Sequence, residues 1–132
     1  MNYWLFKQEP TAYSFSALEK DGKTVWDGVA NNLAQKHLRS VKKGDMVFFY
    51  HTGEEKQVVG LMEIISDPYE DPKQKSAVVV DVRPAGKLAR PVKLESIKRD
   101  PVFSGWELVR LSRLSVMPVP EKLWQRIMKM SR

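Results

Sequence analysis

The chain has 132 residues, which fits one domain and is too short for two ordinary ones, and its 42% hydrophobic content is typical of a globular protein with a core. The absence of cysteine excludes a disulfide framework, a thiolate metal site and a cysteine nucleophile. The 22 lysines and arginines against 16 acidic residues give a net charge of +6, which favours a polyanionic partner, although solubility alone also explains many basic proteins.

The first predicted elements are a strand and a short helix. Residues 2–6 are aromatic and β-prone, which predicts a strand. Ser14 or Ser16 can cap the helix that follows, because a serine hydroxyl accepts a hydrogen bond from a free backbone N–H. Phe15 and Leu18 are three residues apart and are expected on the buried side of this helix.

A second helix and a buried strand follow. Asn31 or Asn32 can cap the helix, whose apolar positions recur at helical spacing. Those positions are Leu33, Ala34, Leu38 and Val41. Residues 46–50 form a continuous apolar run, the pattern of a strand buried on both faces. Phe48 and Phe49 point to opposite faces of that strand, so at least one of them is expected in the core.

The second half of the chain predicts more strands and two further helices. Strands are expected over residues 58–65, interrupted at Gly60, over 77–82, continuing past a bend to Pro91, and over 114–119. Residues 67–72, with two Asp-Pro pairs, predict a loop, and helices are expected over 94–98 and from Pro120 onward. Short strands with helices between them predict one α+β domain over residues 1–132, built on a strongly bent sheet or partly open barrel.

The sequence also predicts a location. The apolar residues 3–6 are followed at once by Lys7, Gln8 and Glu9, which is not the pattern of a secretory signal. No apolar run reaches the roughly 20 residues that cross a bilayer. We therefore expect a soluble cytoplasmic protein with no membrane partner, and a single domain of 15.2 kDa gives no reason to expect more than a monomer.

No pattern of catalytic or metal-binding residues stands out. A Gly-rich phosphate loop, a Gly-x-Ser-x-Gly elbow and a His-Glu-x-x-His motif are all missing. His37 and His51 are isolated and have no metal-ligand spacing. His51 could act as a general base if Asp27 or Asp45 lies near it, but such a histidine more often packs or donates a hydrogen bond. The prediction is a protein that is not an enzyme and binds no cofactor or metal.

Aromatic residues and cations are intermixed in the first 50 residues. Aromatic planes beside cations suit single-stranded nucleic acid or an extruded base, because stacking contributes about 1–3 kcal/mol per base. Trp4, Trp106 and Trp124 lie among apolar residues and are predicted to be core. Trp26 is expected on a loop between two helices, where its indole serves either a ligand or the core.

Six sequence blocks resemble those of the EVE domain family in order and spacing. They are residues 3–10 (YWLFKQEP), 26–29 (WDGV), 49–52 (FYHT), 59–60 (VG), 80–82 (VDV) and 113–119 (RLSVMPV). The resemblance extends to about residue 128 and covers nearly the whole chain. It implies a PUA-like fold, a curved mixed sheet or pseudo-barrel surrounded by short helices. It also implies a relation to YTH domains, which read methylated adenine in RNA.

The resemblance further implies a non-enzymatic reader of an extruded or unpaired modified base, with modified cytosine in DNA as the first candidate and RNA as the other. The base pocket implied by the resemblance consists of Lys7, Gln8, Glu9, Trp26, Asp27, Asn31, Tyr50 and His51. Trp26 would stack on the base, and Gln8, Asp27 and Asn31 would bind its edge. Lys36 and Arg39 would contact phosphate together with Lys7.

Several positions depart from the family pattern, among them Ser76 and Ala77, where the family often has an aromatic residue before the VDV block. Gln8 stands where the family usually has serine, and Ala30 and Gln35 stand where it usually has arginine. The two missing arginines weaken the case for phosphate contacts. They leave open an alternative, a small-molecule or protein-interaction module on the same fold that does not bind nucleic acid.

Overall fold

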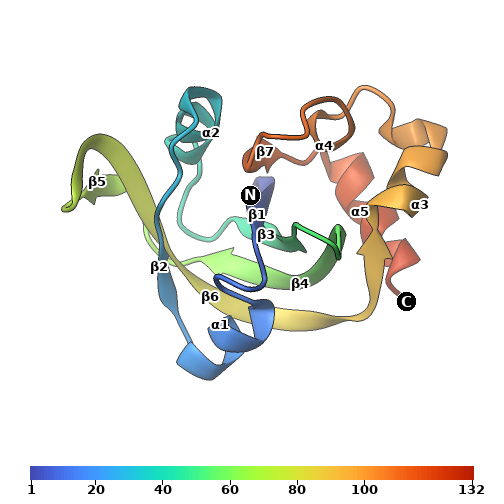
Figure 1. Ribbon diagram of the computed structural model, residues 1–132, viewed down its shortest axis with the longest axis horizontal. Coiled ribbons are helices and arrows are strands. Elements are labelled where there is room, and N and C mark those ends of the chain that lie inside the picture. The colour runs from blue at the N-terminus through green and yellow to red at the C-terminus, as the bar shows by residue number, and fades with distance from the viewer.

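The computed structural model describes residues 1–132 and contains seven strands (Figure 1). The strands are β1 (Tyr3–Gln8), β2 (Thr24–Trp26), β3 (Met46–His51), β4 (Gln57–Ile64), β5 (Tyr69–Asp71), β6 (Gln74–Lys93) and β7 (Val116–Pro118). The helices are α1 (Phe15–Asp21), α2 (Asn32–Leu38), α3 (Leu94–Arg99), the 3-10 helix η1 (Pro101–Phe103), α4 (Glu107–Arg110) and α5 (Glu121–Met130). None of the helices is long and apolar enough to pass through a bilayer.

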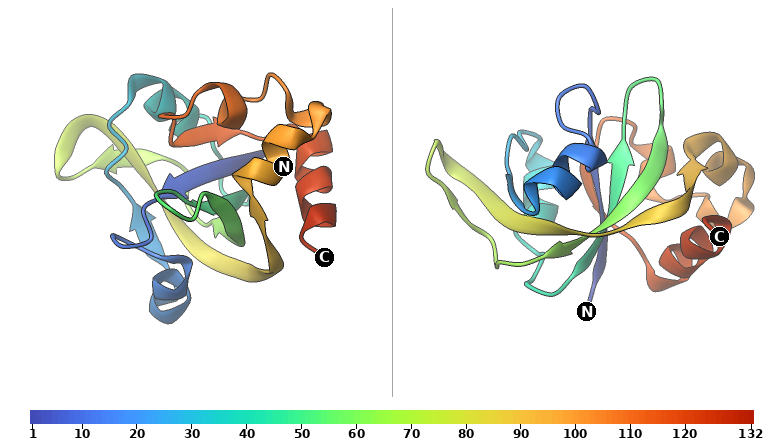
Figure 2. Two further views of the ribbon diagram at one scale, coloured as in Figure 1. Left: turned by 45° about the vertical axis from the view of Figure 1, so that its right-hand side comes forward. Right: turned by 90° about the horizontal axis from the view of Figure 1, so that it is seen from below.

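The strands form one curled mixed sheet in the order β2-β6-β4-β3-β1-β7, with β5 paired to β6 outside this path. The central pair β1 and β3 is parallel, and the other pairs are antiparallel. Strand β6 is 20 residues long and curves from the β5 hairpin to α3, as the view from below in Figure 2 shows. The predicted α+β class with a curved sheet or pseudo-barrel is therefore confirmed.

Both helix caps predicted from the local sequence are present in the structure. The Ser14 side chain accepts a hydrogen bond from Ala17 N at 3.1 Å and begins α1, and Asn31 accepts one from Ala34 N at 3.0 Å and begins α2. The predicted loops were wrong at two places. Trp26 ends strand β2 instead of lying on a loop, and part of the segment 67–72 forms β5.

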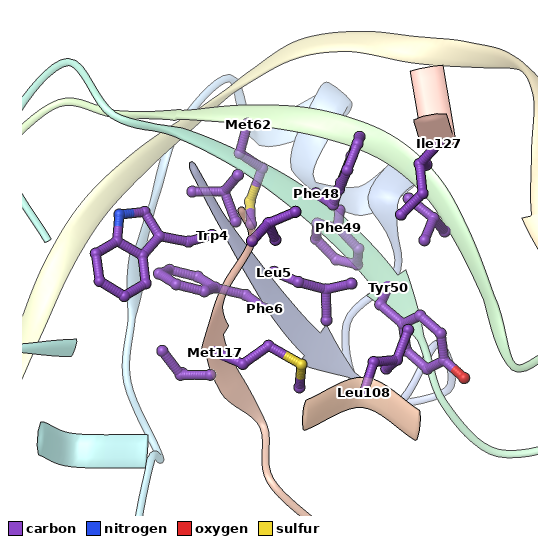
Figure 3. Packing of buried hydrophobic residues seen from close by; sticks show 14 of the residues in the cluster. Trp4, Leu5, Phe6, Phe48, Phe49, Tyr50, Met62, Leu108, Met117 and Ile127 are labelled. Carbon is purple, nitrogen blue, oxygen red and sulfur yellow. The ribbon is translucent and has the colours of Figure 1, made fainter. Parts of the chain in front are cut away.

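The core has two layers, one on each face of the β1–β3 pair. On one face, the Trp124 ring of α5 stacks on Phe48 at 3.8 Å between ring centroids. On the other face, Trp26 packs against Phe6 and Phe49, each at 5.4 Å. Figure 3 shows Phe48 and Phe49 among side chains from neighbouring elements. Because both faces are covered, the apolar run of β3 is buried from Val47 to Tyr50, as predicted, while Met46 is half-buried, and both phenylalanines are core.

The other tryptophans are core as predicted. Trp4 is 5% exposed, and its indole N–H donates to Asp45 Oδ2 at 2.9 Å. The Trp106 indole N–H donates to Pro118 O at 2.9 Å. Trp124 is enclosed between Tyr3 and Phe48. Each ring therefore contributes buried apolar area to the fold.

Gly60 lies where β4 passes beneath α1, and it marks a register shift of β4 against β6 instead of an end of the strand. A Cβ atom at this position would lie 2.5 Å from the Phe15 ring. We expect Gly60→Ala to lower the free energy of unfolding by about 1–3 kcal/mol, because the enclosed ring must shift to admit the methyl group. Chemical denaturation measures this change. The double variant with Phe15→Leu should recover part of the loss, and an unchanged stability of Gly60→Ala would contradict the packing.

Candidate base-binding pocket

A pocket of about 280 Å3 lies at the edge of the sheet where β1 and β2 end. Because β1 and β3 are parallel, the residues that follow them meet at this edge. Thr52 N donates to Gln8 O at 3.0 Å, which joins the two chain segments. The pocket is lined by Lys7, Gln8, Glu9, Trp26, Asp27, Gly28, Val29, Thr52, Ser112, Arg113 and Ser115. Five predicted pocket residues, Lys7 to Glu9, Trp26 and Asp27, thus lie together.

Trp26 forms the back of the pocket and is only 4% exposed. Its ring packs against Phe6 and Phe49 and is almost fully buried, so it offers no open face for a base to stack on. The indole N–H makes no hydrogen bond within the protein, yet every fully enclosed side-chain nitrogen or oxygen has a partner. The N–H is therefore partly accessible to solvent, as a donor without an acceptor on a residue that lines the pocket.

Lys7 lines the pocket and carries a positive charge. Its ammonium donates to Ser112 O at 3.0 Å and lies 5.6 Å from the centre of the Tyr50 ring. Burial lowers the pKa of Lys7 from its usual value, and burial raises the pKa of Tyr50 to about 12. The Tyr50 ring lies against the Lys7 ammonium, and Tyr50 does not line the pocket.

Two carboxylates face the same space. Glu9 accepts hydrogen bonds from Thr52 Oγ1 at 3.3 Å and from Thr11 Oγ1 at 3.4 Å, and Asp27 is exposed at the rim. A Cβ atom at Gly53 would lie 2.7 Å from Glu9 Oε2, and its φ of +73° also favours glycine. The Gln8 side chain accepts from Glu9 N at 3.0 Å, which leaves its amide N–H groups free. The pocket thus offers both acceptors and donors.

His51 lies outside the pocket, and both of its ring nitrogens are engaged. Nε2 accepts a hydrogen bond from Phe15 N at 3.1 Å, so Nδ1 carries the proton and donates to Glu55 Oε1 at 2.8 Å. This hydrogen bond lowers the pKa of Glu55. Asp45 instead binds Trp4, and Asp27 does not contact the histidine. The arrangement predicted for a general base is therefore not formed, and His51 fixes the start of α1.

The predicted residues on α2 are also placed elsewhere. Asn31 caps α2 and does not line the pocket. Lys36 is exposed and does not line the pocket either. Arg39 donates to Ser76 O and joins α2 to the β5–β6 hairpin. Gln35 is 7% exposed; its amide donates to Val29 O at 2.8 Å and accepts from Val78 N at 2.9 Å. Gln35 is therefore used inside the fold and is not available to bind phosphate.

The sequence prediction missed the segment between α4 and β7. Ser112, Arg113 and Ser115 line the pocket, and Lys7 N donates to Ser115 O at 2.9 Å. Arg113 is exposed and has no ion-pair or hydrogen-bond partner in the protein. The signal was present, because Arg113 begins the last block of the resemblance. The structure contains no group of three or more His, Cys, Asp or Glu side chains arranged to hold a metal.

Comparisons with known proteins agree on one family. The model of the EVE domain matches residues 2–130. Thymocyte nuclear protein 1 of Rattus norvegicus is 30% identical over 166 residues, covering 98% of this chain and 73% of the relative. A Rhodopseudomonas palustris protein solved by NMR has a TM-score of 0.94 at 36% identity, covering 99% of this chain and 93% of that one.

A solved human structure shares the fold at lower identity. The human THYN1 protein, solved in complex with DNA that contains 5-methylcytosine, has a TM-score of 0.91 at 23% identity. The match covers 100% of this chain and 98% of the human one.

Proposed function

Because the chain belongs to the EVE domain family, we propose that its pocket binds one unpaired or extruded base of a nucleic acid, without catalysis. A modified cytosine in DNA is the first candidate, and RNA with an unpaired modified base is the second. The human relative bound to 5-methylcytosine DNA supports the choice of cytosine.

The observation that carries the proposal is the free N–H of Trp26. This donor belongs to a side chain that is 4% exposed and lines a pocket of about 280 Å3. This volume lies just below the roughly 300–1,000 Å3 of common small-molecule sites, so it suits one base better than a larger ligand. A ligand acceptor at this point would satisfy the indole, which is otherwise served only by water.

The polar groups of the pocket are complementary to cytosine. Cytosine has an amino group, whose N–H can donate a hydrogen bond to a carboxylate such as Glu9 or Asp27. The ring nitrogen beside that amino group and the carbonyl oxygen next to this nitrogen are acceptors. They can accept hydrogen bonds from the Trp26 N–H or the Gln8 amide. Thymine has an N–H where cytosine has an acceptor, so the same protein donors could form no hydrogen bond with thymine at this point.

The positive charges suit the phosphates on either side of the base. Lys7 and Arg113 line the pocket and can hold a backbone while the base enters. Extruding a base from a duplex costs a few kcal/mol, so a mismatched or single-stranded site should bind more tightly than a paired one. The alternative of a module without nucleic-acid binding keeps its reasons, because Ala30 and the buried Gln35 supply no positive charge. An affinity that falls as the salt concentration rises would indicate nucleic-acid binding and would distinguish it from the alternative.

Replacing Trp26 with phenylalanine tests the proposal. Trp26→Phe retains a ring between Phe6 and Phe49 but removes the N–H, so we expect the affinity for a single-stranded oligonucleotide with one 5-methylcytosine to fall by at least about tenfold. Titration calorimetry measures the affinity without depending on tryptophan fluorescence.

The matched control is Trp124→Phe, which makes the same chemical change in a buried indole outside the pocket. It should bind as the unaltered protein does. The affinities of oligonucleotides with cytosine, thymine or 5-methylcytosine, in DNA and in RNA, show which base and which sugar the pocket prefers. If no oligonucleotide binds at low salt, or if Trp26→Phe binds as well as Trp124→Phe, the pocket is not the base site.

A further inference from the structure

A second cavity of about 340 Å3 adjoins the pocket and shares Ser112 and Arg113 with it. Its remaining walls come from the start of α2, at Asn31 and Leu33, from Arg110 at the end of α4, and from Leu111 and Leu114 in the segment that follows. Figure 1 shows α2 and the segment between α4 and β7 on the same side of the molecule. We call this cavity the side groove. Any chain that leaves the pocket past Arg113 enters it.

The side groove is positively charged and has an apolar wall. Arg110 and Arg113 line it, and none of its lining residues is acidic. Arg110 Nε donates to Gly105 O at 2.7 Å, which orients the guanidinium and leaves its two terminal nitrogens without a partner. Leu33 is one of the few large apolar side chains that are exposed, at 39%, although its helix position had predicted a core residue.

Asn31 adds a hydrogen-bond donor to the same wall. Its side-chain oxygen is used by the cap of α2, where it accepts from Ala34 N at 3.0 Å. The amide N–H groups remain free at the groove. Two arginines, one amide donor and three leucines therefore line a cavity that adjoins the pocket at Ser112 and Arg113.

We propose that the side groove binds the nucleotide next to the base held in the pocket. The connecting phosphate lies between Arg113 and Arg110, because guanidinium groups bind phosphate oxygens in pairs. The sugar and base of this neighbour pack on Leu33, and Asn31 donates to the sugar or phosphate. This inference rests on the proposed function, and it adds that the protein recognises at least a dinucleotide and contacts the neighbour mainly through its backbone.

The test compares a ligand that fills only the pocket with one that fills both cavities. The probes are 5-methyl-2′-deoxycytidine and the DNA trinucleotide with 5-methylcytosine between two thymines, each titrated by calorimetry at several salt concentrations. The unaltered protein should bind the trinucleotide more tightly than the nucleoside. Arg110→Gln should weaken trinucleotide binding by about tenfold and flatten the slope of log affinity against log salt by roughly 0.7.

A second variant and a control keep the result interpretable. Leu33→Glu places a carboxylate in the groove at an exposed position of α2 and should weaken the trinucleotide by a similar factor without unfolding the protein. Lys87→Gln removes one exposed positive charge from β6, away from both cavities, and should leave the trinucleotide affinity within about twofold. All three variants should bind the nucleoside as the unaltered protein does.

The outcomes separate this inference from the proposed function. If neither probe binds, the proposed function fails. If the nucleoside and the trinucleotide bind equally, or if Arg110→Gln and Leu33→Glu weaken the trinucleotide no more than Lys87→Gln does, the pocket binds a base but the side groove does not bind its neighbour.

Discussion

Trp26→Ala is expected to lower the free energy of unfolding by about 3–5 kcal/mol, the usual cost of removing a large aromatic side chain from a core. The Trp26 ring is 4% exposed and lies 5.4 Å from both Phe6 and Phe49. Its removal leaves a cavity between β1, β2 and β3 that these rings cannot fill. Urea denaturation followed by circular dichroism measures the loss.

Trp26→Phe is the matched variant for this stability measurement and should lose only part of that amount, because it retains one aromatic ring. An alanine variant that fails to bind DNA could simply be unfolded, whereas the phenylalanine variant isolates the N–H. A stability of Trp26→Ala equal to that of the unaltered protein would mean that the ring is not packed in solution.

Asp45→Ala is expected to lower the free energy of unfolding by about 3 kcal/mol, since it leaves three donors without an acceptor. Asp45 is 3% exposed and accepts from the Trp4 indole N–H at 2.9 Å, from Asn2 N at 3.0 Å and from Lys42 N at 2.9 Å. These bonds tie the start of β1 to the turn before β3. The same denaturation measurement reports the loss.

Asp45→Asn is the control for this second change. The amide retains one oxygen of similar position, so it should satisfy some of the donors and recover part of the stability. Since Asp45 lines neither the pocket nor the side groove, ligand affinity should remain unchanged while the variant is folded. An Asp45→Ala protein as stable as Asp45→Asn would contradict the role of the three bonds.

The elements that the sequence predicted correctly depend on local signals. Ser14 and Asn31 begin helices because their side-chain oxygens accept from a backbone N–H three residues ahead, within one turn. The apolar run of β3 predicted burial on both faces, because hydrophobic residues at successive positions of a strand need two covered sides. The resemblance to the EVE domain predicted the curved mixed sheet and five of the residues that line the pocket.

The elements that the sequence missed depend on distant partners. Strand β2 has three residues and exists through its pairing with β6, where Trp26 is opposite Val80. Strand β5 pairs Tyr69 with Val79 in the same way. Such short segments carry no period of their own, so only the long strand β6 could define them.

The sequence by itself determined the helix caps, the buried central strand and, through the resemblance, the family and the edge of the sheet where the pocket lies. Only the tertiary structure decided that Trp26 packs against Phe6 and Phe49 and keeps an N–H without an acceptor, and that Gln35 and His51 lie inside the fold. It also brought Arg113 into the pocket, more than 80 residues from Trp26 in the sequence. The physical reason is that hydrogen bonds and ring contacts between distant segments fix a side chain's direction, whereas composition and spacing report only which side chains are available.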